Sequence, residues 1–120
     1  MRVEFHRLTR RRDAMLQVIQ PGYYPEHVWI GAEAIAASLA HRLRAALDVR
    51  QVAITPGGAG RLHAVVAIGE AHPQRVMHAV WDAVKLIKLV TVVDADVDAW
   101  DAQQVEWALA TCSSSSPRPR

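Results

Sequence analysis

Three aspartates alternate with apolar residues directly after an apolar run, residues 86–93, that predicts a buried strand. If the chain stays extended, Asp94, Asp96 and Asp98 point the same way, because alternate residues of a strand share a side. Carboxylate oxygens bind divalent cations, so these three side chains are candidate metal ligands. Their spacing is not that of an EF-hand loop, which requires Gly and Glu where this chain has neither. We favour a strand end whose carboxylates face water or pair with nearby arginines.

Two basic or glycine-rich segments are candidates for binding a phosphate or another anion. The first is the cluster Arg10, Arg11 and Arg12. The second is a turn-like segment whose backbone N–H groups could surround a phosphate; its candidate residues are Gly57, Gly58, Gly60 and Arg61. This segment lacks the Lys-Ser/Thr of a P-loop and leads into a predicted strand rather than a helix. A hairpin turn is therefore the favoured interpretation.

The histidines and the possible nucleophiles show no catalytic spacing. The six histidines do not recur at metal-ligand intervals, and His63 falls on a predicted strand, on the side opposite its apolar residues. Ser38 lies within a predicted helix with no base beside it, and Cys112 opens the C-terminal tail. We expect packed or surface roles for all of them.

Composition limits the class of protein. With 120 residues, of which 51% are hydrophobic, the chain can form one domain with its own core. No apolar run approaches the ~20 residues of a membrane span, and the N-terminus has no signal-like apolar core. A single cysteine fits the reducing cytoplasm. Apart from two arginines in the tail, basic and acidic residues are equal in number. We therefore predict a cytoplasmic protein that binds neither membrane nor nucleic acid.

The predicted elements that position these residues alternate between strands and helices. An opening strand is predicted over residues 2–8; residues 14–19 fit either a strand or a helix, and residues 21–25 form a loop. There follow a helix over 26–47, a hairpin of strands 49–55 and 61–68, a helix from Pro73, the strand 86–93 and a helix from Asp101. This order predicts an α+β fold, a ferredoxin-like β-α-β-β-α-β sheet with helices on one face plus a C-terminal helix. Residues 1–111 form the single domain, and 112–120 a disordered Ser/Pro/Arg tail.

Several segments, in order, resemble the UbiD family of decarboxylases. The segments are Leu8–Ala14, Pro21–His27, Pro56–Val66 and the passage from Val92 to Thr111, which ends in Trp-Ala-Leu-Ala-Thr. The resemblance implies a reversible carboxy-lyase chemistry on aromatic or unsaturated acids. It also implies prenylated FMN as cofactor, with manganese and potassium, for the complete family complex.

The resemblance also implies what this chain does not supply. In the family, the residues that hold the flavin phosphate and the metal, and the Arg and Glu that act on the carboxylate, precede the segment matched by Leu8–Ala14. No catalytic or cofactor-binding residue is therefore assigned, and the family's C-terminal domain is expected to be missing as well. We expect a small subunit or partial homologue that binds no cofactor and is inactive without a cofactor-bearing partner. A split enzyme and a truncated gene are both compatible with this expectation.

Two other kinds of function stay open. One is a non-enzymatic, ferredoxin-like dimeric module that binds a small anionic ligand through the arginine cluster and the glycine-rich turn. The other is a metal-dependent enzyme that uses the three aspartates. In each case we expect partners, either further copies of the chain or a second UbiD-type subunit. Trp100 and Trp107, if exposed, would mark an interface, because tryptophan is enriched there.

Overall fold

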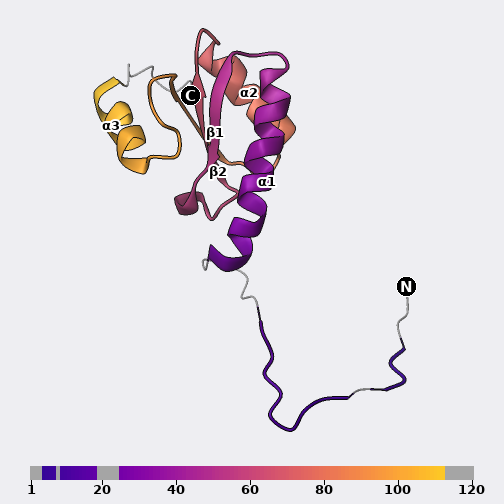
Figure 1. Ribbon diagram of the computed structural model, residues 1–120. Helices are drawn as coiled ribbons and strands as arrows, with labels where there is room; N and C mark the ends of the chain where they lie inside the picture. Colours follow the sequence, from indigo (N-terminus) through magenta and orange to yellow (C-terminus); the bar gives the residue numbers. More distant parts are fainter. Residues whose placement is uncertain (1–3, 8, 19–24, 113–120) are drawn as a thin grey trace.

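The computed structural model describes residues 4–7, 9–18 and 25–112 (Figure 1). Along the chain the elements are α1 (Pro25–Arg44), β1 (Val49–Ile54), the short 3-10 helix η1 (Pro56–Gly58), β2 (His63–Ile68), α2 (Pro73–Ala83), β3 (Leu89–Asp94) and α3 (Ala102–Cys112). Among the described helices, none combines the length and the apolar character that crossing a membrane requires.

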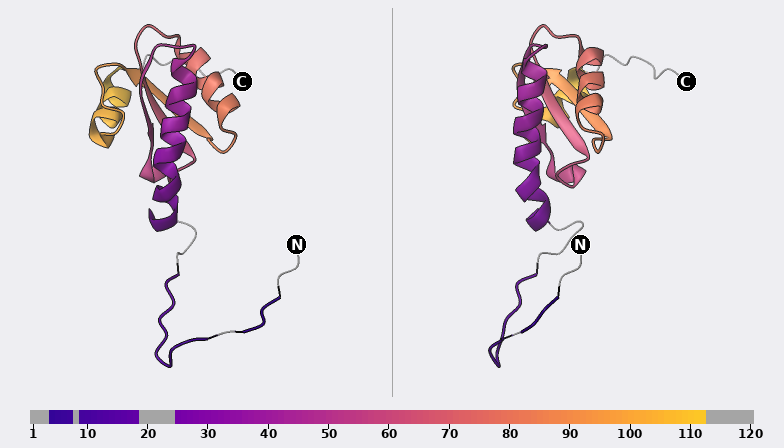
Figure 2. Two further views of the ribbon diagram at one scale, coloured as in Figure 1. Left: turned by 45° about the vertical axis from the view of Figure 1, so that its right-hand side comes forward. Right: turned by 90° about the vertical axis from the view of Figure 1, so that its right-hand side faces the viewer.

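The three strands form one sheet in the order β1-β2-β3. β1 and β2 are an antiparallel hairpin joined through η1, whereas β2 and β3 are parallel and joined through α2. Helices α1 and α2 cover one face of the sheet, called here the inner face, and α3 lies on the opposite, outer face (Figure 2). This arrangement confirms the predicted α+β fold with a C-terminal helix, and it is compatible with a ferredoxin-like fold.

The inner face holds the larger core. Ala32, Ala36 and Ala40 are buried on one side of α1, and these small side chains let the helix lie close to the sheet. Leu39 of α1 and Val76 of α2 are fully buried in the same cluster, and each such side chain contributes about 1.5–3 kcal/mol through its removal from water. The predicted helical periodicity of both segments is confirmed.

The predicted opening strand is not formed in the described residues. Residues 4–7 have no regular structure and are exposed, as are residues 14–18, for which strand and helix were both open. A strand needs a partner for its backbone hydrogen bonds, and alternation of side chains alone does not supply one. We refer to residues 4–7 and 9–18 as the N-terminal arm, which leads away from the domain (Figure 1). Residues 1–3, 8, 19–24 and 113–120, and with them most of the predicted loop and tail, lie outside the described residues.

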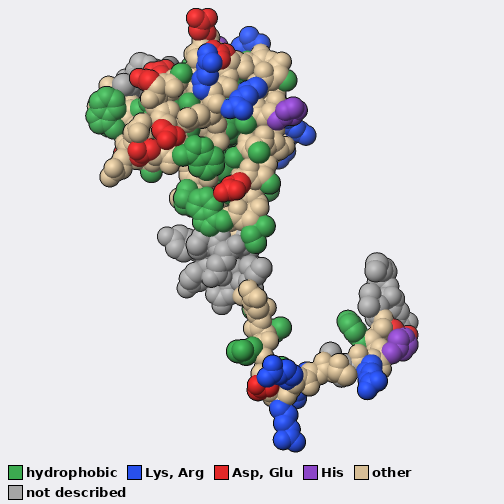
Figure 3. Space-filling view, in the orientation of Figure 1, with side chains coloured by type: hydrophobic (Ala, Val, Ile, Leu, Met, Phe, Trp, Pro, Cys, Tyr) green, Lys and Arg blue, Asp and Glu red, His purple; other side chains and the backbone are tan. Residues whose placement is uncertain are grey.

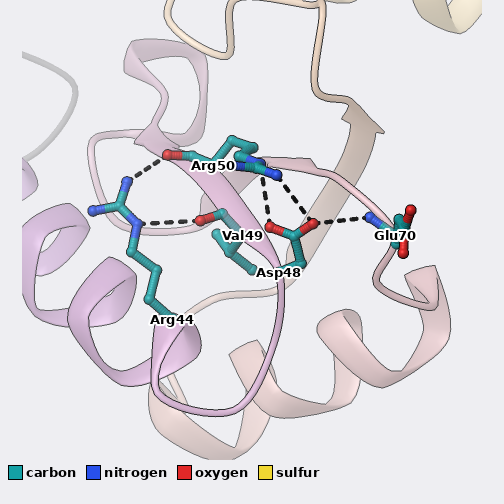
Figure 4. Close-up of polar contacts among 5 residues, drawn as sticks. All are labelled: Arg44, Asp48, Val49, Arg50 and Glu70. Carbon is teal, nitrogen blue, oxygen red and sulfur yellow. Dashed lines mark hydrogen bonds and ion pairs between the residues drawn. The ribbon is translucent and has the colours of Figure 1, made fainter.

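A polar network fixes the start of β1 against its neighbours (Figure 4). The Arg44 guanidinium donates to the Val49 carbonyl at 3.1 Å and also to the carbonyl of Arg50. Asp48 pairs with Arg50 at 3.1 Å, and its carboxylate accepts the Glu70 backbone N–H at 3.1 Å. The end of α1, the edge of β1 and the loop after β2 are thereby tied together.

Candidate functional site

The outer face of the sheet is only partly covered by α3. Val105 and Ala108 of α3 pack against Ala53, Val65 and other small side chains of the sheet. Beside this contact lies a pocket of about 420 Å³, within the size range of small-molecule sites. Its lining residues are mostly apolar and come from β1, the hairpin turn, β2 and α3. The pocket is therefore a hollow on the outer face, between α3 and the sheet.

A row of three hydrogen-bonded side chains crosses the sheet at this pocket. His63, the first residue of β2, lies between Thr55, which follows β1, and Thr91 of β3. Its Nδ1 is 3.0 Å from the Thr55 hydroxyl and its Nε2 is 2.9 Å from the Thr91 hydroxyl. Because Thr55 Oγ1 already accepts the Gly58 N–H at 3.2 Å, the network favours a Thr55 hydroxyl that donates to Nδ1 and an Nε2–H that donates to Thr91.

Partial burial lowers the pKa of His63 below its ordinary value, so the imidazole is neutral near pH 7. The neutral ring satisfies both threonines, with one nitrogen accepting and the other donating. Both nitrogens are thus used inside the protein, and Thr91 is itself buried. The row positions the three strands and forms a polar end to the pocket, and it gives His63 a packed position, one of the two roles expected for it.

The hairpin turn is closed by its own hydrogen bonds. Gly58 and Gly60 both donate to the Thr55 carbonyl, at 3.2 and 3.1 Å, and Arg61 donates to the Gly58 carbonyl at 3.2 Å. A side chain at Gly58 would place its Cβ 2.4 Å from the Cβ of His63, and Gly60 has a left-handed φ of 61°. These glycines therefore serve the turn and the close approach to His63. Donors engaged in this way support the hairpin interpretation over phosphate binding.

The arginine cluster and the aspartates lie apart from this turn. Arg10, Arg11 and Arg12 are exposed in the arm, where Arg11 pairs with Asp13 at 3.0 Å. The structure brings none of these arginines to the glycine-rich turn by any hydrogen bond or ion pair between described residues. The predicted anion-binding candidates thus form two separate groups.

The three aspartates after β3 are exposed to solvent. Asp98 accepts the Trp100 backbone N–H at 3.0 Å and so shapes the turn that leads to α3. Within the described ranges, no three His, Cys, Asp or Glu side chains are grouped so that they could hold a metal ion. The exposure of Asp94, Asp96 and Asp98 is that of a solvated strand end.

Helix α3 begins where the sequence predicts it. Asp101 accepts the backbone N–H groups of Gln103 at 2.9 Å and Gln104 at 3.3 Å, and Gln104 donates its side chain back to Asp101 at 3.0 Å. These backbone bonds lower the pKa of the Asp101 carboxyl, with that from Gln104 the stronger. Trp100, just before α3, and Trp107, in the middle of α3, are 52% and 64% exposed. Figure 3 shows hydrophobic side chains at the surface over α3.

A family profile described as "3-octaprenyl-4-hydroxybenzoate carboxy-lyase C-terminal domain" matches residues 28–114. The chain belongs to the UbiD family. The match also corrects one expectation: the C-terminal domain is not missing, since it is the part that this chain forms. The ordered segments indicated the family, but they could not place the boundary between its domains.

Similar proteins extend far beyond this domain. An anhydromevalonate phosphate decarboxylase of Aeropyrum pernix is 42% identical over 90 residues, which are 72% of this chain and 21% of that protein. One from Methanothermobacter thermautotrophicus is 31% identical over 91% of this chain and 26% of its own length. The chain thus spans about a fifth to a quarter of the curated relatives it matches.

Solved structures agree with the UbiD assignment. The UbiD-class enzyme HmfF from Pelotomaculum thermopropionicum, solved as an evolved dimeric form in complex with prFMN, matches with a TM-score of 0.67 and 37% identity. The match covers 72% of this chain and 21% of that one. A 3,4-dihydroxybenzoic acid decarboxylase of Klebsiella pneumoniae, AroY, matches at 0.65 with 21% identity and shows the shared fold.

Proposed function

We propose that this chain supplies the C-terminal domain of a UbiD-type carboxy-lyase that acts on an aromatic or unsaturated acid, together with a partner polypeptide that bears the flavin. The observation that carries the proposal is the match of residues 28–114 to the family's C-terminal domain in a chain that spans only 21–26% of its decarboxylase relatives. HmfF, a structural neighbour, is described in complex with prFMN.

The described residues do not fit the flavin phosphate or its metal. The N–H groups of Gly58, Gly60 and Arg61 are bonded within the turn, and the described acidic and histidine side chains form no metal-binding group. We therefore assign no catalytic step to this chain. Its contribution is a folded surface that the flavin-bearing partner contacts.

The outer face beside α3 is the surface best suited to that contact. It combines the apolar pocket with the exposed rings of Trp100 and Trp107, and Leu109 of the same helix is 48% exposed. Tryptophan and apolar side chains around a hollow are typical of the centre of a protein interface. Burial there would stabilise α3, whose own contact with the sheet consists of small side chains.

Co-purification from the native host tests the proposal. The tagged chain, recovered from the cytoplasmic fraction where we expect it, should retain a polypeptide that carries the family's flavin-binding segments, with flavin absorbance in the complex. Trp107→Glu should reduce the retained flavin, whereas Ile30→Glu, a matched change at a 72% exposed site on α1, should not. Recovery of the chain without any flavin protein would contradict the proposal.

A thermal-shift screen separates this function from the small-anion module. Phosphate and small carboxylates should leave the melting temperature of the chain unchanged, because the turn's donors are already engaged. A clear rise that is lost in Arg61→Gln would instead favour the ligand-binding module.

A further inference from the structure

Trp100 separates two hollows in the surface of the domain. On one side lies the outer-face pocket of about 420 Å³, between α3 and the sheet. On the other side lies a hollow of about 380 Å³ between α1 and β1, which Ala36, Ala37 and Val52 line together with Trp100. The indole ring, in a residue that is 52% exposed, is thus a wall of both hollows. A ligand that lies over this ring can reach into both of them.

Each hollow has one carboxylate among its described lining residues. Glu106 borders the outer-face pocket and Glu33 borders the hollow at α1, and no described Lys or Arg lines either hollow. Both glutamates are exposed, and neither side chain takes part in an ion pair or hydrogen bond between described residues. The other polar side chains of the outer-face pocket, Thr55 and His63, already bond each other. The charge that an occupant meets beside Trp100 is therefore negative.

The segment around Trp100 extends this negative charge. Residues 89–112, from the start of β3 to the end of α3, contain five Asp or Glu and no Lys, Arg or His. Asp98 and Asp101, which lie on either side of Trp100 in the sequence, belong to this set. Figure 3 shows acidic and hydrophobic side chains together over α3. A surface of this charge attracts a basic partner and repels an acidic one.

A partner that covers the two glutamates must supply groups that replace their water. A carboxylate that loses its hydration is strongly destabilised unless a cation or hydrogen-bond donors take the place of the water. The exposed ring of Trp100 adds a second attraction, because the face of an indole binds a guanidinium or ammonium group through a cation–π contact. Arginine suits both tasks, since its planar group stacks on a ring while its N–H groups bond a carboxylate.

The pair of hollows favours a segment of polypeptide over a small organic cation. A small amine would fill one hollow, whereas apolar walls and a carboxylate lie on both sides of Trp100. Successive side chains of an extended segment point to opposite sides, so a single segment can place side chains in both hollows.

We propose that the flavin-bearing partner binds across Trp100 through a basic segment, with apolar side chains in the two hollows and an arginine or lysine beside Glu33 and Glu106. This contact rests on the proposed function, because it takes the flavin-bearing polypeptide as the occupant. We expect that polypeptide to carry a segment in which arginine or lysine neighbours apolar residues. We also expect the complex to weaken as the salt concentration rises, because salt screens charge pairs at a surface.

Two matched double variants test this contact. The first, Glu33→Gln with Glu106→Gln, removes the charge beside Trp100 and keeps the size of both side chains. The second, Glu4→Gln with Glu70→Gln, removes the same charge at exposed positions in the arm and in the loop after β2. Each tagged chain is used to recover the partner from the native host, and the retained flavin is measured by absorbance at low and at high salt.

At about 50 mM salt, the first variant should retain about tenfold less flavin than the wild-type chain, and the second variant as much as the wild-type chain. At about 500 mM salt, the wild-type chain and the first variant should retain similar amounts, because screening removes the charge pairs. Equal melting temperatures of the three chains check that each variant is folded.

The outcomes separate this contact from the function on which it rests. Equal retention by all three chains, an equal loss in both variants, or a loss in the first variant that persists at high salt would overturn the contact and leave the proposed function intact. A wild-type chain that retains no flavin protein would contradict the proposed function, and the contact with it.

Discussion

The core on the inner face of the sheet includes buried leucine and isoleucine side chains from α1 and the strands, whereas the buried side chains of the outer cluster beside α3 are all alanine or valine. The outer face also carries the Thr55–His63–Thr91 row and the pocket. Large buried side chains contribute most of a domain's stability, so the inner face holds the fold together. The difference agrees with our proposal that a partner contacts the outer face.

The largest effect should come from the inner core. Leu39→Ala, at a side chain that is fully buried, should lower the free energy of unfolding by about 2–5 kcal/mol, through lost burial and the cavity left behind. Leu109→Ala, on the partly exposed outer side of α3, should cost less than about 1 kcal/mol. Chemical denaturation measures both, and equal losses would remove the distinction between the faces.

A smaller effect is expected at the turn below the pocket. Gly58→Ala should destabilise the domain by about 1–3 kcal/mol, because the new Cβ would lie 2.4 Å from the Cβ of His63. Gly57→Ala is the matched control, since nothing lies within 4 Å of a Cβ at that position. If the two variants melt at the same temperature, the close approach of Gly58 to His63 does not contribute to the stability of the domain.

The polar row should give the outer face its own pH dependence. Burial lowers the pKa of His63 in the folded state, so the unfolded state binds the proton first as the pH falls. Stability should therefore be full above the ordinary histidine pKa of about 6.5 and decline as the pH falls below it towards the folded value. Thr91→Val should cost about 1 kcal/mol at neutral pH by removing one partner. A His63→Gln variant with the same pH slope as wild type would contradict this assignment.

The smallest effect is expected at the start of α3. Asp101→Ala removes the acceptor of two backbone N–H groups and should lower the melting temperature slightly, while Asp101→Asn should retain most of the cap. The lowered pKa of Asp101 means that its contribution is present above the ordinary aspartate pKa and is lost as the pH falls through the folded value. Equal melting temperatures for Asp101→Ala and Asp101→Asn would contradict the role of Asp101 as the cap of α3.

Local chemistry made most of the fold predictable. Helical spacing, Pro73 at the start of α2 and the Asp101–Gln104 pair all describe neighbours in sequence, and each indicated the right element. Residues 4–7, the described part of the predicted opening strand, form no strand, because a strand depends on a partner that its own sequence does not specify. The row of His63 with Thr55 and Thr91 also escaped prediction, since it depends on the register that aligns His63 with Leu89. Local sequence patterns cannot predict contacts that depend on strand register, nor the boundaries between the domains of a family.

Cofactor retention tests the central claim most directly. The purified chain, mixed with prenylated FMN and Mn²⁺ and then desalted, should be colourless, because the described turn and acidic side chains provide neither a phosphate cradle nor a metal group. The same mixture with the flavin-bearing partner should keep its flavin absorbance and decarboxylate an aromatic or unsaturated acid. Retention of one flavin per chain by the isolated protein would contradict the account.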